Sequence, residues 1–113
     1  MPAKGSDAVL VPLTGAFAAA GTDAANGQPY RGTVRLTIAG NALRYHGDYA
    51  GTRYSGVALY GPETGVLAVT FHQAGTGHSG VLLMHARPDG WEGTWTWSGD
   101  AQGRIGTERW VMR

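Results

Sequence analysis

The chain has 113 residues, a formal net charge of +1 and 15% charged residues, which predicts one domain with a modest core. This weak charge, with eight arginines scattered along the chain, excludes an electrostatic hold on nucleic acid or on an anionic membrane. The lack of cysteine excludes disulfides and thiolate chemistry, and no apolar run approaches the roughly 20 residues of a membrane-spanning helix. We therefore expect neither nucleic acid nor membrane as a partner. We also expect a cytoplasmic location, with a secreted or periplasmic protein as the alternative.

The first 20 residues, MPAKGSDAVLVPLTGAFAAA, resemble a secretion signal in having a lysine, an apolar stretch and an alanine-rich end. Pro12, Thr14 and Gly15 interrupt the apolar stretch. We therefore expect a flexible N-terminus over residues 1–8 and a first strand over residues 9–18, with a signal peptide as the alternative. The single domain is expected to span residues 1–113.

Seven further strand-like runs follow, separated by turns rich in Gly, Asn, Asp and Pro. They cover residues 30–38, 42–50, 53–60, 66–73, 79–86, 91–98 and 104–112. In the first of these runs Tyr30, Val34 and Leu36 alternate with polar residues, which is typical of a half-buried antiparallel strand. In residues 79–86 both faces carry apolar side chains, so the sequence does not decide which face points inward. The two candidate sets are Val81, Leu83 and His85, or Leu82 and Met84.

Six of the seven connections between these runs have five residues or fewer, which favours antiparallel hairpins over parallel crossovers. The sequence therefore predicts an all-β fold, an eight-stranded antiparallel up-and-down β-barrel, with a flattened barrel or sandwich as the alternative. An eight-stranded barrel is either filled by side chains or holds one small ligand. The connections at 19–29, 51–52, 74–78 and 99–103 would meet at one end, where we expect the first and longest to cap the opening.

The stretch GWEGTWTWSG, residues 90–99, places three tryptophans on one face of a strand, because successive side chains of a strand point to opposite faces. We expect this row to line the barrel interior from one end to the other. The predicted ligand-binding residues are Trp91, Trp95, Trp97, Trp110, Tyr45, Tyr49, Tyr54 and Phe71. A packed aromatic core is the alternative. Four glycines on inward faces could either interlock with the aromatic rings or leave a pocket; these are Gly32, Gly47, Gly56 and Gly93.

Glu108 shares a face with Trp110, so it is expected inside the barrel. A buried carboxyl must be paired, hydrogen-bonded or raised in pKa. Glu108 is therefore either held by a tyrosine, tryptophan or arginine, or serves as a ligand anchor or a general acid/base. The candidate catalytic residues are Glu108 and Tyr54.

The four histidines show neither H-x-H nor HExxH spacing, and no phosphate-binding loop is present. A metal site between His72 and His85, across their hairpin, is the remaining metal candidate. We expect no metal and no cofactor.

The segments GTDAANGQPYRGTV (21–34), YSGVAL (54–59), LAV (67–69), PDGWEGTW (88–95) and IGTE (105–108) carry a family resemblance. With them the chain resembles small bacterial domains of uncharacterised function, some of which carry a fibronectin-binding label. TWSG followed by RIGTERW is similar to the avidin-type biotin barrels, although the N-terminal polar residues that hold the biotin ureido ring are not found. The resemblance implies a calycin-like or avidin-like β-barrel.

Three functions remain open. The first is a binding barrel that holds a flat, mainly apolar or aromatic small molecule. The second is a cofactor-independent isomerase or cyclase that uses Glu108 with a tyrosine for proton transfer. The third is a structural or partner-binding domain with a filled core. Barrels of the allene oxide cyclase and lipocalin type host the first two roles, by analogy of fold alone. Whether the chain is an enzyme, and whether it forms a homodimer, stays open.

Overall fold

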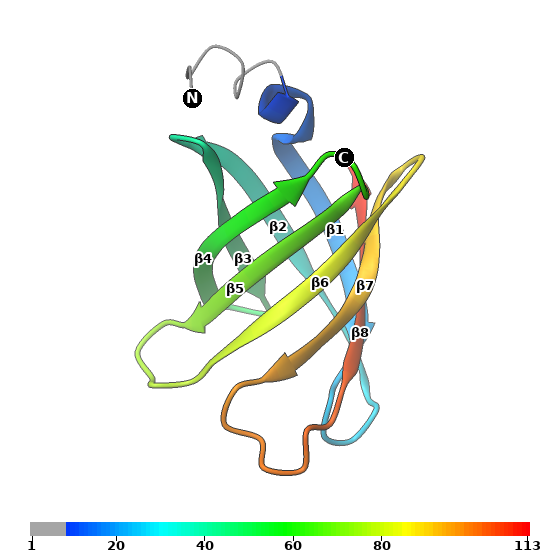
Figure 1. The fold of residues 1–113 in the computed structure, drawn as a ribbon. Helices are drawn as coiled ribbons and strands as arrows, with labels where there is room; N and C mark the ends of the chain where they lie inside the picture. Colours follow the sequence, from blue (N-terminus) through cyan, green and yellow to red (C-terminus); the bar gives the residue numbers. More distant parts are fainter. Residues whose placement is uncertain (1–8) are drawn as a thin grey trace.

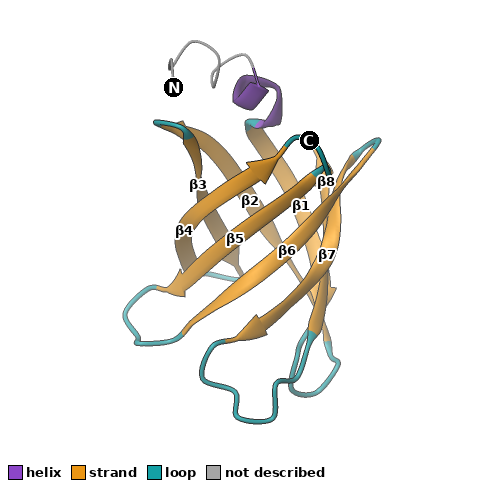
Figure 2. Ribbon diagram, viewed as in Figure 1, coloured by secondary structure: helices purple, strands orange, loops and turns teal. Residues whose placement is uncertain are grey.

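Eight antiparallel strands close into a barrel in the computed structural model, which describes residues 9–113 (Figure 1). The strands are β1 (Gly15–Thr22), β2 (Pro29–Ala39), β3 (Ala42–Tyr49), β4 (Thr52–Gly61), β5 (Val66–Gln73), β6 (Ser79–Arg87), β7 (Gly90–Trp97) and β8 (Gly106–Met112). Each strand pairs with its neighbour in the chain, and β8 pairs with β1. This closure leaves no free edge among the described strands. The predicted up-and-down barrel is confirmed, and within residues 9–113 helical structure is confined to a short piece before β1 (Figure 2).

The first strand begins later than predicted. Val11–Leu13 form a 3-10 turn, η1, and β1 starts only at Gly15. Pro12 lacks the N–H that a strand ladder needs, and the turn closes when Thr14 donates its N–H and its hydroxyl to the Val11 carbonyl, at 3.1 and 2.8 Å. The predicted flexible segment, residues 1–8, lies outside the described residues.

The later end of β1 also corrects the prediction about the loops. Because β1 continues to Thr22, its connection to β2 shrinks to residues 23–28. The longest connection is instead residues 98–105, between β7 and β8. Both lie at the lower end of the barrel in Figures 1 and 2, together with the β3–β4 and β5–β6 connections. We call this end the mouth.

The sequence did not decide which face of β6 points inward. In the structure this strand buries Leu82 and Met84 and exposes Val81 and Leu83. The register explains this choice. Leu82 pairs with Trp95, and Met84 pairs with Gly93, both of which belong to the inward set of β7. Sequence alternation thus fails for β6 only because its outer face is also apolar.

The end of the barrel opposite the mouth is filled, and we call this part the floor. Trp110 is fully buried there, stacked on Tyr45 at 5.8 Å between ring centroids and packed against Phe17 at 6.0 Å. Leu10 and Leu13, on either side of Pro12 in the turn region, join the same hydrophobic cluster. The barrel is therefore closed at one end by its own side chains.

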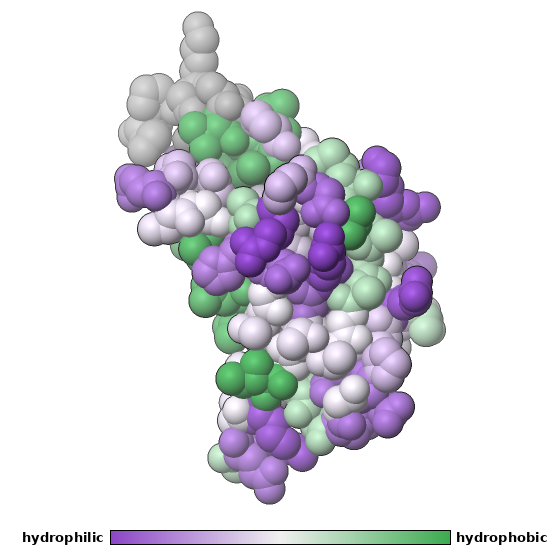
Figure 3. Space-filling view, turned by 90° about the vertical axis from the view of Figure 1, so that its right-hand side faces the viewer, coloured by the Kyte–Doolittle hydropathy of each residue, from purple (hydrophilic) through white to green (hydrophobic). Residues whose placement is uncertain are grey.

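The outer surface on the side shown in Figure 3 is a mosaic of hydrophilic and weakly hydrophobic residues, with strongly hydrophobic ones in separate areas, the largest of them at the upper end. Among residues 9–113, no helix has the length and apolar character needed to cross a membrane.

Candidate functional site

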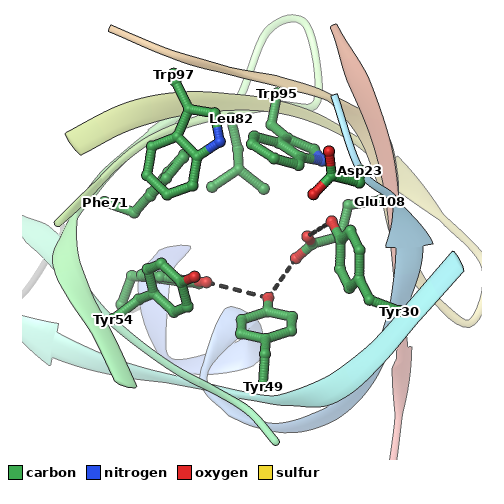
Figure 4. A pocket seen from close by; sticks show the side chains of 10 residues that line it. Asp23, Tyr30, Tyr49, Tyr54, Phe71, Leu82, Trp95, Trp97 and Glu108 are labelled. Atoms are coloured by element: carbon green, nitrogen blue, oxygen red, sulfur yellow. Dashed lines mark hydrogen bonds between the residues drawn. The ribbon is translucent and has the colours of Figure 1, made fainter. Parts of the chain in front are cut away.

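A cavity of about 190 Å³ lies inside the barrel near the mouth. Its wall combines aromatic rings with two carboxylates, and Figure 4 shows these side chains pointing toward a common centre. The lining residues are Asp23, Tyr30, Tyr45, Tyr49, Tyr54, Phe71, Leu82, Trp95, Trp97 and Glu108. They come from β2 to β8 and from the β1–β2 loop, so the site exists only when the barrel is closed.

Six of the aromatic rings contact one another in a closed circle around the cavity, which we call the collar (Figure 4). In order around the circle they are Tyr30, Tyr49, Tyr54, Phe71, Trp97 and Trp95. Neighbouring centroids are 5.2–6.2 Å apart and the ring planes are inclined by 69–85°. Such edge-to-face pairs contribute about 0.5–1.5 kcal/mol each beyond burial. Contacts between its own rings therefore stabilise the collar.

Glycines on the same or the neighbouring strand make room for rings of the cavity wall. A Cβ on Gly47 would lie 2.5 Å from the Tyr45 hydroxyl and 2.8 Å from the Tyr49 ring. A Cβ on Gly32 would likewise meet the ring of Tyr49, and one on Gly106 would meet the indole of Trp95. Of the four glycines expected on inward faces, Gly32 and Gly47 thus interlock with aromatic rings, whereas a Cβ on Gly56 or Gly93 would meet the backbone of a neighbouring strand.

The carboxylate of Glu108 is the polar centre of the site. The side chain is 5% exposed. One oxygen, Oε1, accepts a short hydrogen bond from the Tyr30 hydroxyl, and Oε2 accepts from Tyr49 Oη at 2.5 Å and from Trp110 Nε1 at 2.6 Å. Since Tyr49 donates its only hydroxyl proton to Glu108, Tyr45 must donate to Tyr49 across their 3.1 Å contact. Three neutral donors hold this carboxylate.

Burial raises the pKa of Glu108 above its ordinary value, although the bonds from Trp110, Tyr30 and Tyr49 act in the opposite direction. Burial and then the neighbouring Glu108 charge raise the pKa of the Tyr30, Tyr45 and Tyr49 phenols well above 10. These phenols therefore stay protonated at neutral pH and act as hydrogen-bond donors.

Trp95 carries a polar group that the protein leaves without a partner. Its side chain is 9% exposed, and its Nε1 is buried with no hydrogen-bond acceptor. Figure 4 shows this nitrogen turned toward the side of the cavity where Asp23 and Glu108 lie. A buried N–H without an acceptor costs roughly 1–3 kcal/mol. A ligand oxygen or nitrogen in the cavity would remove that cost.

The loops at the mouth are held by their own aspartates. Asp23 Oδ1 accepts from the backbone N–H groups of Ala25 and Asn26, at 2.7 and 3.2 Å, which fixes the β1–β2 loop. Asp100 accepts from the backbone N–H and the guanidinium Nε of Arg104, at 3.1 and 3.0 Å, across the β7–β8 loop. The guanidinium bond is the main reason that the pKa of Asp100 is lowered. Contacts between residues close together in the sequence thus hold both loops at the opening.

Six of the eight residues expected to bind a ligand line the cavity, and two do not. The six are Tyr45, Tyr49, Tyr54, Phe71, Trp95 and Trp97. Trp91 and Trp110 are instead buried in the floor, where Trp91 packs edge-on against Tyr60 at 6.0 Å. Strand parity puts Trp91 and Trp97 on one face, but six residues separate them by roughly 20 Å along the strand.

Of the two candidate catalytic residues, Glu108 is buried inside the barrel, as expected, and the phenols that bond it are Tyr30 and Tyr49 rather than Tyr54. Tyr54 lines the cavity and contacts Tyr49 and Phe71 through its ring. Tyr30 was missed as a site residue although its parity already placed it inside. Asp23 was missed because loop residues follow no parity.

The two histidines considered as metal ligands lie far apart. In the β5–β6 hairpin His72 pairs with Ser79 near the mouth, while His85 pairs with Val66 at the other end. Both side chains are exposed. That candidate site is therefore wrong. Within residues 9–113, no three His, Asp or Glu side chains gather closely enough to hold a metal ion.

A second hollow, of about 540 Å³, is bordered mainly by outward-facing residues of β2 to β4, among them Arg35, His46 and Arg53. These side chains are exposed, and Arg53 lies 4.0 Å from Asp48. Among the described residues, no buried side-chain polar group there lacks a partner. We therefore place the candidate site inside the barrel.

The chain matches no protein-family model, no curated protein and no solved structure. The resemblance to calycin-like and avidin-like domains, the location of the protein and its partners therefore stay predictions. The function has to be inferred from the geometry of the mouth.

Proposed function

We propose that the chain is a small-molecule binding barrel whose ligand is flat and mainly apolar or aromatic. The observation that carries this proposal is the collar, which surrounds a cavity of about 190 Å³ next to the filled floor. A domain selected only for stability would gain from filling this space, because side chains in protein interiors are close-packed. The volume is below the 300–1,000 Å³ of sites for drug-sized ligands, so it suits a molecule of one or two rings.

The unpartnered N–H of Trp95 supports the same proposal, because a polar atom of a bound molecule could pair with it. Among described residues it is the buried side-chain polar atom that the fold leaves unsatisfied. A ligand with one neutral hydrogen-bond acceptor would satisfy it, whereas an acceptor with a full negative charge would be repelled by Glu108. The polar group would then orient a ligand that the collar holds mainly by apolar contact.

Catalysis by Glu108, as an isomerase or cyclase, is the less favoured proposal. A general base needs a free lone pair that faces the substrate. Three of the roughly four lone-pair positions of this carboxylate are already occupied by Tyr30, Tyr49 and Trp110. A base held in this way is better suited to fixing the collar than to removing a proton.

Calorimetric titration with three probes tests the proposal, namely indole, tert-butylbenzene and phenyltrimethylammonium. We expect at least one of them to bind with a stoichiometry of one. Replacing Trp97 by Ala removes a half-buried collar ring and should weaken that binding at least tenfold. Leu83→Ala is the control, because Leu83 is an apolar residue of the outer face, and the affinity of this variant should equal that of the original protein.

The proposal is overturned if none of the three probes binds saturably, or if Trp97→Ala and Leu83→Ala give the same affinity. In either case the domain with a filled core and a structural role would be the better interpretation.

A further inference from the structure

The charges that face the cavity are all of one sign. Of its ten lining residues, Asp23 and Glu108 are acidic and none is basic. None of the arginines that form ion pairs among the described residues lines the cavity. Arg53 pairs with Asp48, Arg87 with Glu92, Arg104 with Asp100, and Arg109 with Asp89 and Glu92. A ligand in the cavity therefore meets two carboxylates and no compensating cation among the described residues.

Glu108 needs a positive partner that its hydrogen bonds do not provide. Tyr30, Tyr49 and Trp110 donate protons to it, but each of these groups is neutral. Buried charges in proteins are normally paired or bound to a metal, because an isolated buried charge is costly. In its ionised form Glu108 is a buried anion without a counter-charge among the described residues, at the edge of a cavity that a ligand can enter.

The collar itself favours a cation. The face of an aromatic ring carries partial negative charge, so it attracts ammonium groups within about 6 Å of the ring centre, and more strongly where water is excluded. Six rings surround a space of about 190 Å³ here, and two of them, Trp95 and Trp97, belong to the type that binds cations best. Rings and carboxylates thus favour the same ligand charge.

We propose that the ligand of this cavity is a small organic cation, an aromatic or alkyl ammonium, held between the collar and the carboxylates of Asp23 and Glu108. This inference rests on the proposed function, because it assumes that the mouth binds a small molecule. Apolar contact alone does not distinguish a cationic from a neutral ligand, whereas the two carboxylates do.

A pair of probes with one shape and different charge tests the inference. Phenyltrimethylammonium and tert-butylbenzene differ in having a positive nitrogen or a neutral carbon at the branching atom. We expect calorimetry to give at least tenfold tighter binding of the cation, a difference of about 1.4 kcal/mol. Equal affinities, or tighter binding of tert-butylbenzene, would overturn the cation inference and leave the binding function standing. Failure of both probes and of indole would overturn the proposed function itself.

Variants of the two carboxylates then show the source of the preference. Glu108→Gln and Asp23→Asn each remove one negative charge and keep the side-chain shape, and the new amide oxygen in Asp23→Asn can still accept the N–H bonds that fix the loop. Each change should reduce the ratio of the affinity for phenyltrimethylammonium to that for tert-butylbenzene at least threefold. Glu63→Gln is the control, because Glu63 lies in the β4–β5 loop at the far end and its replacement changes the net charge equally. A preference that survives both carboxylate substitutions would contradict the role of Asp23 and Glu108.

Discussion

Glu108 shows how one residue can connect the stability of the barrel to the properties of its cavity. Its three donors come from β2, β3 and β8, so the carboxylate links strands on different sides of the barrel. Removing the side chain with Glu108→Ala would leave Trp110 Nε1 without an acceptor inside the core. A buried donor left without its acceptor lowers the free energy of unfolding by roughly 1–3 kcal/mol.

Glu108→Gln is the more informative change, because the amide can keep most of this network. Its oxygen can accept from Tyr49 and Trp110, and its NH₂ group can donate to Tyr30, whose hydroxyl already lies 3.3 Å from the Thr107 carbonyl. The variant should therefore fold, and it differs from the original protein chiefly in having no group to ionise at this position.

The pH dependence of stability follows from the raised pKa of Glu108. A carboxyl whose folded pKa exceeds its unfolded value, about 4.3, contributes stability that is complete below that value and is lost as the pH rises through the folded pKa. We therefore expect the unfolding free energy of the original protein, relative to Glu108→Gln, to fall as the pH rises above about 4. Urea unfolding of both proteins from acidic to neutral pH measures this difference.

The other ionisable groups around Glu108 do not change the sign of this effect. Tyr30, Tyr45, Tyr49 and Tyr54 have raised pKa values, so they remain protonated through this range. A relative stability that rises with pH would mean that the three hydrogen bonds outweigh burial.

Among the strands, the site depends on how rings of one strand lie over glycines of the same or the next strand. Sequence alternation predicted that Gly32 and Gly47 face inward together with the aromatic residues. It could not predict whether the space they leave is filled, because that depends on the direction in which each ring tilts from its own strand. The structure shows that Tyr45 and Tyr49 occupy the space beside Gly47.

Gly47→Ala tests this interlocking. The new Cβ would meet the Tyr45 hydroxyl and the Tyr49 ring, so both rings must move and the Tyr49 bond to Glu108 must weaken. We expect a loss of about 1–3 kcal/mol in the free energy of unfolding, as is typical of overpacked cores. Denaturant midpoints with unchanged slope would measure it.

The matched control for this change is Gly77→Ala. Gly77 lies in the β5–β6 loop, where an added Cβ has no atom within 4 Å. The unfolding free energy of this variant should stay within about 0.5 kcal/mol of that of the original protein. If Gly47→Ala were equally harmless, the rings would not be held by close contact with this strand.

For the molecule as a whole, the sequence predicted the fold better than the site. Short turns and period-two alternation were enough for the number, direction and order of the strands, because hairpin connections allow few other arrangements. The first strand was misplaced because Pro12 allows a turn where alternation alone suggests a strand. Parity placed Trp91 and Trp97 on one interior face, but it does not report that the interior is packed at Trp91 and open at Trp97.

The proposed binding function depends on this division into a filled floor and an open mouth, and the indole N–H signals of the tryptophans report on it directly. In a ¹⁵N-labelled sample, saturated with whichever of the three probes binds most tightly, we expect the Trp95 and Trp97 signals to shift. Trp91, buried in the floor against Tyr60, should keep its position. Trp→Phe variants assign the signals. A shift of Trp91 as large as those of Trp95 and Trp97, or no shift of the latter two, would show that the ligand does not enter at the mouth.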